Sequence, residues 1–209
     1  MENEIIETIK YKGYDINIYP DYDAESPEGW MDDISFLVNY HRDFFVSNDE
    51  IITEDDVRNW YNDIKIEQSK KYHIFALSML SHSGIALSLE RSFVCDSGGW
   101  DTSHVGIVLV SKKEARTKKK ALEIADGLLE NWNNYLSGRV YGFMIDKLNE
   151  SIWGFFGDYR DSGIIDEAKG IIDYEVEKRT KRHLRKLRSY IKNNVSLESR
   201  EPLETTMFA

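Results

Sequence analysis

The sequence predicts an α+β fold: a mainly antiparallel sheet built from hairpins, one long helix packed on it, and a long C-terminal helix. Two observations lead to this prediction. Short β-like segments follow one another through turn signals rather than helical crossovers, which is typical of antiparallel strands. Two long segments, 112–136 and 164–195, instead place apolar residues at helical spacings of three and four.

The first strands are predicted as a hairpin over residues 5–19, where alternating segments flank the turn signal Lys12-Gly13. Residues 34–40, with the sequence ISFLVNY, predict a short strand. Thr53 is followed by three carboxylates and predicts a helix N-terminus, since anions in the first turn suit the helix dipole.

The middle of the chain predicts three further strands. Residues 72–80 and 85–89 are β-like and flank the turn-forming sequence SHSG. Residues 91–103 are rich in Gly, Ser and Asp and predict a loop. Residues 105–110, with the sequence VGIVLV, are the most apolar β-branched run and predict a central strand.

The two long helices frame a second hairpin. The helix over 112–136 has one apolar stripe and ends before Gly138, where a left-handed residue is expected. Strands are predicted at 140–145 and 151–156, around Asn149-Glu150. The chain is therefore predicted to comprise an α+β domain, a C-terminal helix with a basic second half, and a flexible tail. These three parts cover residues 1–160, 161–195 and 196–209.

The composition predicts a soluble, cytoplasmic protein. With 209 residues, the chain is long enough to bury a core without a metal or a disulfide. Its single cysteine, Cys95, excludes an intramolecular disulfide and fits a reducing compartment. No apolar run approaches the ~20 residues that span a bilayer. The acidic N-terminus lacks the order of a secretion signal, so we expect no membrane association.

The charge is unevenly distributed along the chain. The formal net charge is −10, yet residues 1–70 hold 18 acidic and 6 basic residues, a net charge of −12. An acidic face can imitate a phosphate backbone and occupy a nucleic-acid-binding site on a partner. The alternative is that these residues only keep the protein soluble. The candidate partner-binding residues are Asp21, Asp23, Glu25, Asp32 and Asp33.

Residues 178–188 have the opposite character, with seven basic residues and no acidic one. Three roles fit this pattern: binding phosphates along one helix face, packing against the acidic N-terminal part, or solvating a long helix. The candidate nucleic-acid-binding residues are Lys178, Arg179, Lys181, Arg182, Arg185, Lys186 and Arg188.

Polar residues at strand ends and turns form a candidate catalytic or small-ligand site. His41 and Arg42 follow a predicted strand, His82 lies in the SHSG turn, and Asp101 and His104 lead into the central strand. An Asp that orients a His is the base half of a nucleophilic triad. The same residues also suit ordinary structural hydrogen bonds, and no G-x-S-x-G elbow is present, which disfavours acyl transfer.

The sequence predicts neither a metal nor a cofactor. The five His are not paired at helical ligand spacing, and one Cys excludes Cys-rich zinc sites. The acidic clusters lack the glycine-centred order of an EF-hand loop. The chain contains no Walker loop and no Rossmann fingerprint.

Six short motifs follow one another along the chain. They are His41-Arg42, His82 to Gly84, Trp100 to Gly106, Ser111 to Glu114, Tyr135 to Gly142 and Ile152 to Gly157. In this order they resemble a family of small proteins encoded by bacteriophages, plasmids and integrated elements, most of which have no assigned function. That family shows a His-Arg pair, an HSG turn and the stretches WDSGQVG, VSKE, YLTGDVYG and CWGFYG. The match spans about residues 30–160.

The chain departs from the family pattern at several positions. Ser103 and His104 stand where the family has Gly-Gln, and Ile152 stands where it has Cys. The resemblance implies a mobile-element origin and a location in the host cell, but no mechanism. By analogy with small acidic phage proteins, our leading hypothesis is an accessory protein rather than an enzyme. It would bind and modulate a host protein, such as a defence or nucleic-acid-handling complex, as an inhibitor or nucleic-acid mimic.

Two alternatives stay open at this point. The first is a small-ligand-binding protein or a hydrolytic enzyme that uses the His, Arg and Asp residues at the strand ends. The second is a nucleic-acid binder that uses the basic C-terminal helix.

Overall fold

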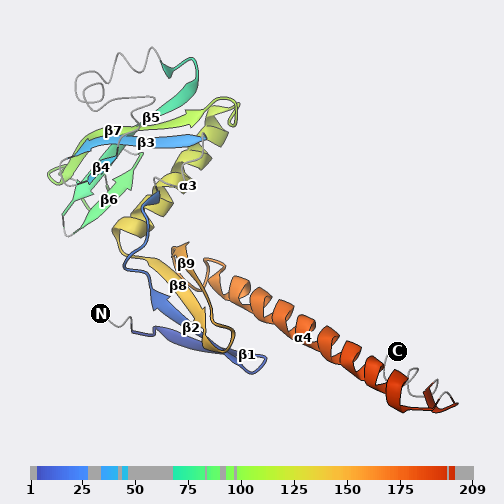
Figure 1. Ribbon diagram of the computed structural model, residues 1–209. Helices are drawn as coiled ribbons and strands as arrows, with labels where there is room; N and C mark the ends of the chain where they lie inside the picture. The colour runs from blue at the N-terminus through green and yellow to red at the C-terminus, as the bar shows by residue number, and fades with distance from the viewer. Residues whose placement is uncertain are drawn as a thin grey trace.

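Figure 1 shows a computed structural model of the protein, in which two antiparallel sheets each pack against a long helix. The structure describes residues 4–27, 34–41, 44–46, 68–82, 84–89, 93–96, 98–196 and 198–200. The first sheet is built from segments far apart in the chain. Its first two strands precede the second sheet in the sequence, and its last two strands follow it.

Sheet A consists of two hairpins. In spatial order its strands are β1 (Glu7–Tyr11), β2 (Tyr14–Pro20), β8 (Val140–Ile145) and β9 (Glu150–Phe156). The predicted hairpins are both confirmed. The first turns at Lys12 and Gly13, whose φ angles are 48° and 82°, and the second turns through a 3-10 segment, Asp146–Leu148, and Asn149. Antiparallel pairing of β2 with β8 joins the two hairpins into one sheet.

Sheet B carries the predicted central strand. Its strands are β3 (Ser35–His41), β4 (Phe44–Val46), β5 (Tyr72–Ser81), β6 (Ile85–Ser88) and β7 (Thr102–Ser111). The spatial order is β4–β3–β7–β5–β6, with antiparallel neighbours. Val108 and Val110 of β7 belong to the core beneath a helix, while Ile107 and Leu109 belong to an apolar cluster on the opposite face. A strand buried on both faces explains the continuous apolar run.

Helix α3 (Lys118–Leu136) covers one face of sheet B. The buried residues on its apolar stripe are Ala121, Ala125, Leu129 and Trp132. The prediction that this helix begins at residue 112 is wrong. Thr117 is its N-cap, because its side-chain oxygen accepts a hydrogen bond from the Lys120 N–H at 3.2 Å. Gly138, just past the helix, has the expected positive φ of 69°.

Asn133 of α3 holds the edge strand β6. Its Oδ1 accepts a hydrogen bond from the Leu87 N–H at 2.7 Å, and its Nδ2 donates to the Leu87 carbonyl oxygen at 2.9 Å. One amide side chain thus pairs with the strand backbone as a neighbouring strand would. The β6 edge of sheet B is thereby tied to helix α3.

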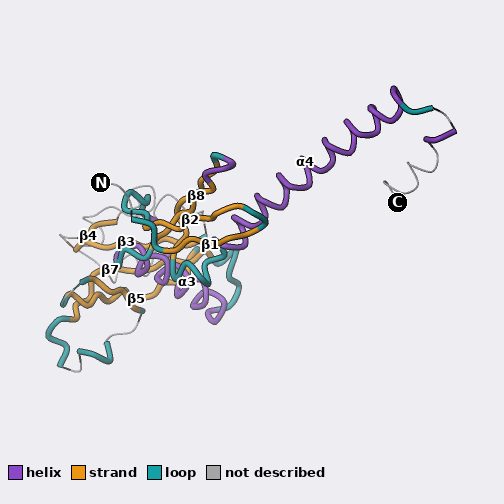
Figure 2. The backbone as a smooth tube through the Cα atoms, turned by 90° about the horizontal axis from the view of Figure 1, so that it is seen from below, coloured by secondary structure: helices purple, strands orange, loops and turns teal. Residues whose placement is uncertain are grey.

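Helix α4 (Ile164–Asn194) is anchored to sheet A through its first half. Ile164 and Ile172 are buried against the apolar face of the sheet. Lys12 Nζ lies 2.6 Å from Asp173 Oδ1, which ties the helix to the turn of the first hairpin. Farther along, α4 projects away from both sheets in the views of Figures 1 and 2.

The α+β class and the long C-terminal helix are confirmed, but the strands form two sheets rather than one. Periodicity identifies a strand without identifying its partner. Here the β1–β2 hairpin pairs with the β8–β9 hairpin, and the strands between them in the sequence form a sheet of their own. The helix predicted after Thr53 and most of the predicted tail, residues 201–209, lie outside the described residues.

Gly106 allows β3 to approach β7 closely. A Cβ there would lie 2.0 Å from the Val38 carbonyl oxygen and 2.7 Å from Asn39 Cα. We expect Gly106→Ala to lower the free energy of unfolding by about 2 kcal/mol, because the backbone must shift. Gly127→Ala in α3, where a Cβ meets nothing within 4 Å, is the control and should be stabilising by about 0.5–1 kcal/mol. Urea denaturation measures the free energy of unfolding of both variants. A Gly106→Ala variant as stable as the wild type would contradict the close approach of β3 to β7.

Candidate functional site

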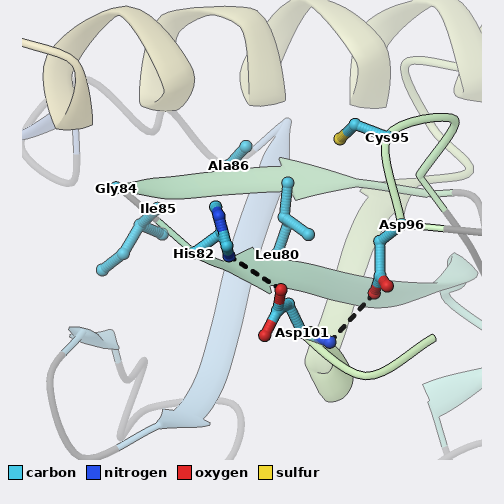
Figure 3. A pocket seen from close by; sticks show the side chains of 8 residues that line it. All are labelled: Leu80, His82, Gly84, Ile85, Ala86, Cys95, Asp96 and Asp101. Carbon is cyan, nitrogen blue, oxygen red and sulfur yellow. Dashed lines mark hydrogen bonds and ion pairs between the residues drawn. The ribbon is translucent and has the colours of Figure 1, made fainter. Parts of the chain in front are cut away.

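A cavity of about 410 Å³ lies at the edge of sheet B, between the β5–β6 turn and the loop that leads into β7. We call this loop the Asp96 loop; its described residues are 93–96 and 98–101. The lining combines apolar residues of β5 and β6 with His82, Cys95, Asp96 and Asp101. Figure 3 shows these side chains around the cavity.

The floor of the cavity is apolar because strand alternation turns Leu80 and Ala86 to one face. These residues lie opposite each other in the β5–β6 pairing and both line the cavity. Their chain neighbours Met79 and Leu87 are buried in the core beneath α3. Leu80 and Ala86 therefore lie on the face of sheet B that is turned away from α3, whereas Ile85, which also lines the cavity, packs against the core beneath α3.

His82 and Asp101 meet at the wall of the cavity, as the dashed line in Figure 3 marks. His82 Nδ1 lies 2.8 Å from Asp101 Oδ2. In the neutral imidazole, a proton on Nδ1 is donated to this carboxylate and Nε2 is left as an acceptor. Both side chains stay accessible, with exposed fractions of 74% and 42%. His82 is therefore placed to accept a hydrogen bond or a proton from a molecule in the cavity.

The Asp96 carboxylate organises the loop that carries Asp101. It is only 9% exposed and accepts hydrogen bonds from the Thr102 hydroxyl at 2.7 Å and from the Asp101 and Trp100 N–H groups at 3.0 and 3.1 Å. The hydroxyl contributes most, and together these donors hold the pKa of Asp96 below the usual aspartate range. The buried carboxylate thus positions the residue that orients His82.

The same loop presents apolar side chains to solvent. Trp100 is 91% exposed, and Val94 is fully exposed. Cys95, between Val94 and Asp96, is exposed and lines the cavity. The Asp96 carboxylate accepts a hydrogen bond from the Trp100 N–H and so holds the backbone at this residue, while the side chain extends into solvent.

Two of the five predicted site residues converge in the cavity, namely His82 and Asp101. Asp101 orients His82 rather than its near neighbour His104, whose Nδ1 lies 3.0 Å from a backbone carbonyl oxygen of β5. His41 ends β3 and is outside the described lining of the cavity, and Arg42 lies outside the described residues. His104 lies on β7, which begins at Thr102, so strand pairing rather than nearness in the sequence decides which histidine Asp101 contacts.

Reasoning from the sequence missed Asp96 and Cys95. The signal for Asp96 was present: an aspartate followed by Gly98-Gly99 is typical of a loop folded around a side-chain carboxylate. The position of Cys95 on the cavity lining had no such signal, because it depends on how the loop crosses the sheet edge.

The predicted acidic surface is only partly described. Asp21 Oδ2 accepts a hydrogen bond from the Gly154 N–H at 3.1 Å, so this carboxylate joins the end of β2 to β9. Asp23 and Glu25 are exposed, and the other two candidates lie outside the described residues. Binding of a host protein by this surface stays a prediction.

All seven basic candidates on α4 are exposed. Lys178 and Lys181 form ion pairs within the helix, with Glu175 and Glu177. The Arg179 guanidinium lies 5.8 Å from the centroid of an aromatic ring of β2. The structure therefore gathers this set on one element, separate from the cavity.

A second cavity, of about 530 Å³, lies where α3 meets the end of β9. Its charged lining consists of Asp126, Glu130, Asp158, Asp161 and Arg139. Among the described residues that line it there is no histidine–carboxylate pair, so we place the candidate site in the first cavity.

Within the described ranges, no group of three or more His, Cys, Asp or Glu side chains could hold a metal ion. Among the helices of the described part, none combines the length and apolarity needed to cross a bilayer. The chain matches no known protein-family model, no curated protein and no solved structure. The family resemblance therefore stays a prediction, and the function has to be inferred from the residues themselves.

Replacing Asp96 should loosen the loop. In Asp96→Ala the N–H groups of Trp100 and Asp101 lose their acceptor, so we expect their hydrogen exchange to accelerate about tenfold or more. Asp126→Ala, which removes an exposed carboxylate of α3, is the matched control and should leave both amides unchanged. Exchange rates resolved by NMR test this, and unchanged protection in Asp96→Ala would show that the carboxylate does not organise the loop.

Acid should loosen the same loop. The pKa of Asp96 is lower in the folded chain than in the unfolded one, so the ionised carboxylate stabilises the fold. That stabilisation is complete above the ordinary aspartate pKa of about 3.9 and is lost as the pH falls through the depressed folded-state pKa. After correction for intrinsic exchange rates, protection of the Trp100 amide should hold from pH 7 to about pH 4. Loss of protection already between pH 7 and pH 5 would argue against this role.

Proposed function

We propose that this protein binds a small molecule in the cavity beneath the Asp96 loop, with His82 as the residue that hydrogen-bonds it. The observation that carries the proposal is the 2.8 Å contact between His82 Nδ1 and Asp101 Oδ2 at the cavity wall. It fixes the imidazole through one nitrogen and leaves the other available.

The size and lining of the cavity support this function. About 410 Å³ is within the range of small-molecule sites, which combine an apolar surface with a few placed polar groups. Leu80 and Ala86 supply the apolar surface, and His82 supplies the polar group. Since Nε2 of the neutral imidazole accepts hydrogen bonds, the fitting ligand has a hydroxyl, amine or amide N–H beside an apolar part.

The arrangement favours binding over acyl transfer. Nucleophilic catalysis requires the nucleophile within hydrogen-bond reach of its base. Among the described residues no hydrogen bond joins the Cys95 thiol to His82. The Thr102 hydroxyl is committed to Asp96 at 2.7 Å. A nucleophile and its base are therefore not assembled in the described part of this site.

A fragment screen by protein-observed NMR tests the proposal. The probes are small hydroxyl- and amide-bearing aromatic compounds at millimolar concentration, and the reporters are the His82 imidazole and the Asp101 amide. We expect a subset of fragments to shift both signals in the wild type, and the same fragments to leave the Asp101 amide unshifted in His82→Ala.

The matched control is His183→Ala, which removes an exposed histidine of α4 and should bind the fragments as the wild type does. If no fragment shifts these signals, or if His82→Ala binds them equally well, the cavity is not a ligand site of the kind proposed.

A further inference from the structure

The second half of α4 forms a charged surface that is independent of the cavity. Beyond Val176, which packs at the margin of the core beneath the helix, α4 continues from Glu177 to Asn194 over about 27 Å. Figures 1 and 2 show this half of the helix extending away from both sheets. The seven basic residues at 178–188 lie in this part and are exposed.

The basic side chains share one side of the helix. At about 100° per residue, all seven fall within about half of the helix circumference. Arginine recurs at every third position from Arg179 to Arg188, so the guanidinium groups form a row that winds along this side. Leu184 and Leu187 fall on the opposite side and are partly buried. We call the charged side the basic face.

Charge inside the helix compensates only part of the basic face. Glu175 and Glu177 pair with Lys178 and Lys181, near the point where the helix leaves the sheet. Arg182, Arg185 and Lys186 lie midway along the basic face and take part in neither of these pairs, although Arg182 is near enough to Glu175 to help lower the pKa of that carboxylate. The centre of the face is thus the part most available to an external anion.

We infer that the basic face binds the phosphate backbone of a nucleic acid. Four of its seven cations are arginines, whose planar forks match phosphate oxygens in pairs. The other residues of the chain carry a formal net charge of −17, because the chain totals −10 while residues 178–188 contribute +7. This negative charge on the rest of the protein repels nucleic acid. A helix that carries its cations beyond the point where it leaves sheet A resolves this conflict, although Arg179, at the start of the basic face, lies 5.8 Å from a ring of β2.

An anionic membrane fits the helix less well. Binding at a membrane surface needs a broad apolar side opposite the charged one, commonly with Trp or Phe. Here Leu184 and Leu187 form a narrow strip, and Ile191, the next apolar residue along it, is only 4% exposed and so has little surface left to offer. This side of the helix therefore lacks the broad apolar area that a membrane surface would cover.

The test compares binding of the full chain to a 20-base-pair DNA duplex, a 20-base-pair RNA duplex and vesicles with one third anionic lipid. In fluorescence anisotropy at about 50 mM salt, we expect both duplexes to bind, with affinity that falls steeply as salt rises. The triple variant Arg182→Gln, Arg185→Gln, Lys186→Gln should bind about 100-fold more weakly. Its slope of log affinity against log salt should be shallower by about 2 to 3.

The matched control carries Lys118→Gln, Lys119→Gln and Lys120→Gln, three exposed lysines of α3, and makes the same change in net charge. It should keep the affinity and the salt slope of the wild type, and circular dichroism should show equal helix content in both triple variants. Three outcomes would each overturn the inference. Both triple variants could weaken binding equally, the protein could bind vesicles but neither duplex, or it could bind no duplex even at low salt. The cavity variant His82→Ala should bind the duplexes normally, so failure here is distinct from failure of the proposed ligand site.

Discussion

The architecture depends on the pairing of β2 with β8, two strands separated by residues 21–139 of the chain. This pairing closes sheet A and brings the buried residues Ile16 and Ile18 beside Phe143 and Ile145. The surface that these residues form is the one on which the first half of α4 packs. Until these two strands pair, the helix has no complete apolar face to pack against.

The same topology separates the two proposed binding surfaces. Sheet B and α3 are inserted between β2 and β8, and they carry the cavity with its His82–Asp101 pair. Sheet A anchors α4, which carries the basic face. A short link joins the end of α3 to β8 of sheet A. It is held by a hydrogen bond that the Arg139 N–H donates to the Asn134 carbonyl oxygen at 2.8 Å. Each surface can therefore change its chemistry by substitution without repacking the core that supports the other.

Much of the fold could be predicted from the sequence because its signals are local. The turn at Lys12-Gly13, the apolar run of β7 and the apolar stripe of α3 each reflect interactions within a few residues. The start of α3 was misplaced because the lysines and glutamate after Ser111 have good helix propensity, whereas the cap at Thr117 sets the boundary. Division into two sheets was not predictable, since pairing partners lie far apart in the chain.

The candidate site was predictable only in part, for a related physical reason. His82 and Asp101 were recognisable as chemically suitable residues at a turn and a strand start. That they contact each other depends on the antiparallel pairing of β5 with β7, in which Leu80 lies opposite Thr102. The basic face was visible in the sequence as a run of positive charge. How far it extends beyond the sheets depends on where sheet A ends beneath α4.

The central claim about function is that Asp101 holds His82 by Nδ1 and leaves Nε2 to the cavity. The nitrogen-15 chemical shifts of the His82 ring, measured at a pH where the imidazole is neutral, test this claim most directly. The account predicts a protonated Nδ1 and a bare Nε2, with this preference lost in Asp101→Ala. A ring protonated mainly on Nε2 in the wild type, or one whose tautomer does not respond to Asp101→Ala, would contradict it.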